Sequence, residues 1–177
     1  LELISQPRFL QALVASALGY AIMTFLMTAT PISMHVMEKM SISKTGMVIQ
    51  FHVVAMFLPS LVTGILIKKF GHSNMMYVGV FLYCITILIS FFDQTFYNYM
   101  FALIFLGLGW NFLFISGTSL LVLTYREEEK FRAQGLNDFI VLGSYTFIFE
   151  PGKNKLCLNF SSSKIPFINF CNFDVSC

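Results

Sequence analysis

The stretch that decides the fold is QTFYNYMFALIFLGLGWNFLFISGTSLLVLTY, residues 94–125, which contains no Asp, Glu, Lys or Arg. A helix that crosses a bilayer needs about 20 mostly apolar residues. The stretch exceeds that length, and charged side chains are costly inside hydrocarbon. It therefore predicts a membrane-spanning helix.

Three further windows without a charged residue precede this one, and each is long enough to cross a bilayer. They are residues 9–37, 45–67 and 70–92. Helices pair their own backbone groups in lipid, whereas an open sheet edge leaves them unpaired. We therefore expect an all-α fold, a polytopic membrane helix bundle in which short connections make neighbours antiparallel. The expected spans are about 10–34, 45–67, 74–92 and 98–124.

The last part of the chain departs from this pattern. The apolar stretch at 139–149 is too short to cross alone, so we expect a partial fifth span at 133–149. Residues 151–177 are rich in Asn, Ser, Phe and Lys and show no helical period. We expect a half-bundle over 1–150 and a non-native-looking or disordered tail over 151–177. The tail's composition resembles an out-of-frame stretch, as a truncated or frameshifted gene would give.

Composition limits the class of function. Hydrophobic residues make up 56% of the chain and charged residues 11%, against about 25% charged in soluble domains. The net charge of +2 gives no basic stripe for nucleic acid. There is no Gly-rich phosphate loop, no carboxylate pair in a span, and His35 lies too far from His52 for a helical metal pair. We expect the lipid bilayer as partner, and no cofactor, metal, catalytic residue or enzyme activity.

Basic residues set the expected orientation. If the N-terminus is cytoplasmic, Lys and Arg residues fall mainly on that side of the membrane, as the positive-inside rule requires. The cytoplasmic set would be Arg8, Lys68, Lys69, Arg126, Lys130 and Arg132, and the opposite set Lys39 and Lys44. We therefore expect a multi-pass protein of a bacterial inner membrane with its N-terminus inside.

The connection between the second and third spans carries a recognisable pattern. Residues 64–72 read GILIKKFGH, with Gly64 near a helix end, Lys68 and Lys69 at the turn, and Gly71 after them. Gly71 suits a backbone turn with positive φ, and Gly64 leaves room for a neighbouring helix. A generic basic turn between two hairpin helices would also explain the pattern.

The loop resembles the signature loop of the major facilitator superfamily (MFS), with Lys68 standing where the family has an acid. Other stretches strengthen the resemblance to the second half of such a transporter, helices seven to eleven. They are Ala29-Thr30-Pro31, Gln50-Phe51-His52, residues 56–60, residues 107–112 and residues 134–138. The resemblance implies a partial MFS fold, a small-molecule substrate and a missing N-terminal half. It also implies transport by alternating access, with the chain inactive alone.

Polar and small residues within the spans are the candidate sites. His52, Gln50 and Asn111 are candidates for a substrate or proton pathway, because intramembrane polar groups are costly without a role. The alternative for His52 and Asn111 is a hydrogen bond that locks two helices. Pro59 can kink its helix.

Two glycines complete the candidate set. Gly107 and Gly109 can permit close helix packing or gating. Two other functions compete with transport. One is a small membrane scaffold or accessory subunit, and the other, less favoured, is a membrane-embedded enzyme built around His52.

Overall fold

The structure is a computed structural model that describes residues 6–92 and 95–149; the expected tail at 151–177 lies outside them. All its elements are helical. They are α1 (Pro7–Ile32), the π-helical turn η1 (Ser33–Met37), α2 (Ile42–Phe57), α3 (Ser60–Phe70), α4 (His72–Ser90), α5 (Phe96–Val122), the 3-10 turn η2 (Glu127–Glu129) and α6 (Lys130–Phe149). The expected all-α helix bundle is confirmed for these residues.

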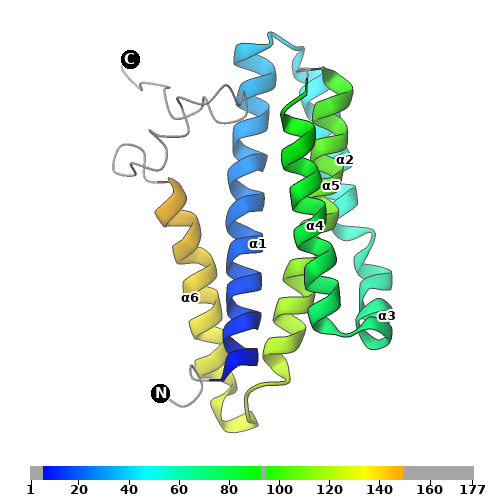
Figure 1. The fold of residues 1–177 in the computed structure, drawn as a ribbon. Coiled ribbons are helices and arrows are strands. Elements are labelled where there is room, and N and C mark those ends of the chain that lie inside the picture. The colour runs from blue at the N-terminus through cyan, green and yellow to red at the C-terminus, as the bar shows by residue number, and fades with distance from the viewer. Residues whose placement is uncertain (1–5, 93–94, 150–177) are drawn as a thin grey trace.

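Helix α5 is the centre of the bundle. It packs against α1, α2, α3 and α4, whereas α6 packs against α1. Figure 1 shows α6 beside α1, on the side away from α4, and successive long helices running in opposite directions. The starts of α1, α4 and α6 lie at one end of the bundle (Figure 1). The cationic residues near those starts therefore share an end.

Within residues 6–92 and 95–149, three segments are long and apolar enough to cross a membrane: Pro7–His35, His72–Ser90 and Phe96–Val122. The expected span at 45–67 is a fourth, but it is broken. Helices α2 and α3 meet at an angle of 41° across the residues between Phe57 and Ser60. The cause is Pro59, which has no backbone N–H and whose ring clashes with the preceding turn.

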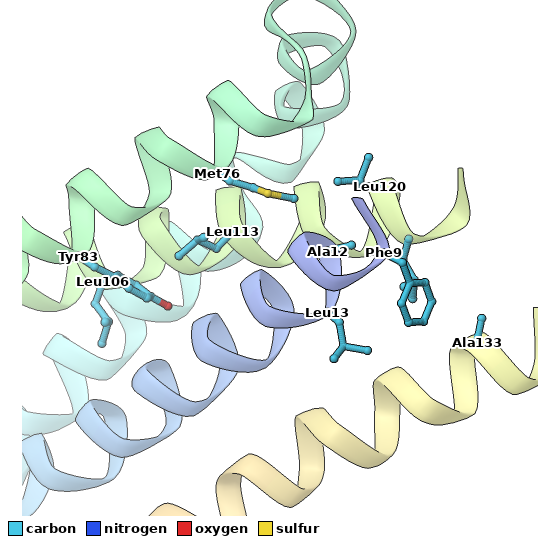
Figure 2. Close-up of a cluster of buried hydrophobic side chains, with 10 residues drawn as sticks. Phe9, Ala12, Leu13, Met76, Tyr83, Leu106, Leu113, Leu120 and Ala133 are labelled. Carbon is cyan, nitrogen blue, oxygen red and sulfur yellow. The ribbon is translucent and has the colours of Figure 1, made fainter. Parts of the chain in front are cut away.

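The interior is built from close helix contacts at small residues. Figure 2 shows Leu13 of α1, Tyr83 of α4 and Leu113 of α5 in the buried cluster that these helices share. A Cβ on Gly79 would lie 2.7 Å from Leu113 Cγ and 2.9 Å from the Gly109 carbonyl oxygen. Lipid provides no hydrophobic force between helices, so such close backbone approaches supply the packing energy.

Polar side chains join the helices as well. The Tyr83 hydroxyl donates to the Gly19 carbonyl at 2.7 Å, which ties α4 to α1. The Ser16 hydroxyl donates to Asn137 Oδ1 at 2.8 Å, which ties α1 to α6. Large apolar side chains on the outer faces are exposed; Leu61, at 77%, is an example. An apolar exterior around a polar-linked interior is what lipid as solvent favours.

Candidate functional site: a broken helix and an aromatic row on α5

The break between α2 and α3 is joined by one side chain from α5. Asn111 is fully buried, and its Nδ2 donates to the Met56 carbonyl of α2 at 2.6 Å. A carbonyl only accepts, so the amide must turn its nitrogen to Met56 and its oxygen the other way. That oxygen accepts from the Thr63 hydroxyl of α3 at 2.6 Å. Asn111 therefore contacts both sides of the break, and we call these three residues the hinge latch.

Thr63 also belongs to the local geometry of the break. Its hydroxyl lies 2.8 Å from the Pro59 carbonyl oxygen, one helical turn earlier. Its backbone N–H donates to the same carbonyl at 2.9 Å. A hydroxyl has one proton, so this hydrogen is shared between Pro59 and Asn111 Oδ1.

His52 is fully buried between α2 and α5. Its Nδ1 lies 2.7 Å from the Leu103 carbonyl oxygen and must donate to it. Among the described residues its Nε2 has no hydrogen-bond partner. Beside it the helices almost touch, because a Cβ on Gly107 would lie 2.8 Å from the His52 carbonyl oxygen. His52 thus joins α2 to α5 through Nδ1, while its Nε2 is unpaired within the described residues.

The other candidate residues do not gather around His52. Gln50 is exposed on α2, because residues two apart on a helix do not share a face. Gly109 lies against α4, where its Cβ would meet the Tyr83 ring at 2.7 Å. His52 and Asn111 both lie between α2 and α5, but they bind different partners.

The loop between α3 and α4 matches only part of what we expected. Gly71 has φ +86°, which a residue with a Cβ rarely adopts. Gly64 is exposed, and a Cβ there would meet nothing within 4 Å, so no described helix approaches it. Lys68 and Lys69 are exposed, and Lys69 Nζ lies 5.4 Å from the Phe70 ring centre.

An aromatic row centred on α5 was not predicted from the sequence. The Trp110 and Phe114 rings are stacked, with centres 4.9 Å apart and planes within 12° of parallel. Tyr20 of α1 lies 6.4 Å from Phe114, and Phe57 of α2 lies edge-on to Trp110 at 6.5 Å. We call these four residues the aromatic row. The four-residue spacing of Trp110 and Phe114 on one helix face was the signal available in the sequence.

Comparison with known proteins identifies the family. Over 143 residues, 81% of its length, the chain is 41% identical to the riboflavin transporter RfnT of Brucella anthropi. Two uncharacterised MFS-type transporters of Bacillus subtilis also match. YdeG is 36% identical over 68% of the chain, and YddS is 34% identical over 70%. This chain belongs to the major facilitator superfamily. No protein-family model and no solved structure matches it.

The match to these MFS-type transporters is partial. The chain covers 36% of the length of RfnT, 28% of YdeG and 29% of YddS. The resemblance to the superfamily that the sequence indicated is thus confirmed, together with membrane helices suited to it. The relatives are named as transporters, and their names say nothing of the hinge latch or the aromatic row.

Proposed function

We propose that this chain supplies the second-half helices, seven to eleven, of a secondary transporter that moves a small solute by alternating access. The observation that carries the proposal is the 41% identity to a riboflavin transporter over 81% of the chain. Riboflavin is accordingly the first solute to test. In such transporters a midplane site opens to each side in turn, as one helix bundle rocks against the other.

The broken span supports this mechanism. Discontinuous helices at membrane depth place backbone carbonyls beside the solute pathway in secondary transporters. Here Pro59 breaks the span, and Asn111 holds both sides of the break. We propose that the break is where α3 changes its angle to α2 during transport. His52 of α2, whose Nε2 has no hydrogen-bond partner within the described part of the chain, is the proposed proton or solute contact.

The chain spans about a third of the length of its transporter relatives. One bundle cannot enclose a pathway that two bundles form, so we propose that the chain transports only together with an N-terminal half. The end of the bundle that carries Arg8, Lys69 and Arg132 is proposed to face the bacterial cytoplasm, following the positive-inside rule.

Uptake into proteoliposomes tests the proposal. We expect no riboflavin accumulation with the chain alone, and accumulation when the RfnT N-terminal half is reconstituted with it. Uptake by the chain alone would show that the requirement for a second half is wrong. The scaffold function would be favoured if the chain assembles with the N-terminal half but the pair moves neither riboflavin nor any of a panel of small solutes.

A further inference from the structure

The aromatic row lies at a junction of three helices. Helices α1 and α2 both pack against α5, and each sends one ring to the stacked pair on α5. Tyr20 faces Phe114, and Phe57 faces Trp110. Four aromatic side chains from three helices, joined by three ring pairs, form a surface with one chemical character.

The row is incompletely covered. Phe57 is 60% exposed, and Tyr20, Trp110 and Phe114 are each half-buried. The Trp110 indole N–H is buried and finds no hydrogen-bond partner among the described residues. Buried Trp N–H groups usually have a partner, so this donor is unusual. The row therefore presents aromatic surface that the described helices do not fully cover.

We infer that the aromatic row binds the planar, heteroaromatic ring system of the solute, with the solute ring extending the Trp110–Phe114 stack. Aromatic rings prefer offset stacking with centres about 4.5–7 Å apart, and the pair already adopts that arrangement at 4.9 Å. The inference rests on the proposed function, because it takes the row to face the solute pathway.

A flavin-type ring fits these requirements. It is flat, and its fused rings offer an extended π-face for stacking. A polyol chain has no ring to stack. The row therefore distinguishes solutes by their aromatic part, so a solute reduced to that part alone should still bind.

Trp110 gives a direct measurement, because it is the only tryptophan in the chain. The full chain in detergent micelles is titrated with lumiflavin, which is the flavin ring without its ribityl chain, and the tryptophan emission is followed. We expect saturable quenching, absent with free N-acetyltryptophanamide in empty micelles. Ribitol, the polyol part alone, should not compete.

Variants locate the binding site. Phe114→Leu should weaken lumiflavin binding roughly 2- to 12-fold, the range for one aromatic stacking contact, and Tyr20→Leu should weaken it less. Phe81→Leu is the matched control, because Phe81 is exposed on α4, outside the row. Circular dichroism checks that each variant keeps its helices. If Phe114→Leu loses them, Tyr20→Leu and Phe57→Leu decide the result.

Three results would overturn the inference: quenching that is linear with lumiflavin, equal affinity in the Phe81 and Phe114 variants, or competition by ribitol. These outcomes are separable from failure of the proposed function, which uptake measures. Lumiflavin binding without uptake by the reconstituted pair would support the ring-binding site and contradict the proposed transport. Uptake of a non-aromatic solute without lumiflavin binding would support transport and contradict the ring-binding site.

Discussion

Replacing Asn111 with Leu tests the hinge latch most directly. Leu has the same number of side-chain heavy atoms and the same branching as Asn, so the change removes both hydrogen bonds to the broken span and leaves no cavity. The Met56 carbonyl loses a donor at 2.6 Å, and the Thr63 hydroxyl loses an acceptor at 2.6 Å. Hydrogen bonds between membrane helices average about 0.6 kcal/mol and reach about 1.7 kcal/mol. Two of them predict a loss of about 1–3 kcal/mol in the free energy of unfolding.

A double-mutant cycle isolates one of the two bonds. Thr63→Val keeps the shape of the side chain but removes its hydroxyl, and the Asn111→Leu/Thr63→Val pair completes the cycle. We expect a coupling energy of about 0.6–1.7 kcal/mol between the two sites. Unfolding in mixed detergent and SDS micelles, followed by circular dichroism, gives each free energy. Asn74→Leu is the control, because Asn74 is exposed and its side chain bonds, among the described residues, to the Phe70 carbonyl four residues earlier.

Two results would refute this reasoning. One is a zero coupling energy, which would mean that the two side chains do not bond in the folded protein. The other is an Asn111→Leu variant at least as stable as the parent, which would mean that the contacts across the break cost as much as they contribute.

Three other changes test neighbouring features. Gly107→Ala should destabilise the bundle by about 1–3 kcal/mol in the same unfolding assay, because its Cβ would lie 2.8 Å from the His52 carbonyl oxygen. Gly64→Ala is the control and should be neutral or stabilising, because its Cβ would meet nothing within 4 Å. Equal effects of the two substitutions would contradict the close packing at Gly107. Pro59→Ala should stabilise the broken span by up to about 3 kcal/mol and slow uptake by the reconstituted pair; unchanged uptake would exclude a moving break. Cys84, exposed on α4, should resist maleimide in membranes and react once SDS unfolds the chain, in a variant whose other cysteines are Ser, because the thiolate that attacks maleimide does not form in hydrocarbon; labelling in intact membranes would place Cys84 in water.

The sequence predicts a bundle of membrane helices for a simple physical reason. Charge is excluded from hydrocarbon, so charge-free windows such as 94–125 mark membrane helices without reference to any tertiary contact. The helices α1, α4 and α5 begin and end within a few residues of the expected spans. The kink expected at Pro59 also follows from local chemistry, because proline removes a backbone donor wherever it stands.

The contacts between helices were harder to predict from the sequence. Asn111 was expected either to bind solute or to lock two helices, and only the fold shows that it meets Met56 and Thr63. The sequence predicted that Gly64 and Gly107 both allow a neighbouring helix to approach. In the structure Gly64 faces open space, whereas Gly107 lies against the backbone of α2. Which side of a helix meets a neighbour depends on its rotation within the bundle, and a uniformly apolar helix carries little sequence signal for that rotation.

The central place of α5 has a consequence for the order of events during synthesis. Ribosomes deliver the chain from its N-terminus, so α1, α2, α3 and α4 enter the bilayer before the helix against which all four pack. Until α5 is inserted, these helices lie in lipid without their main packing partner. The first five helices should therefore associate late, once residue 122 has been inserted, and α6 should pack against α1 afterwards. A ribosome stalled before that point should leave separate helices, and one stalled after it an associated bundle.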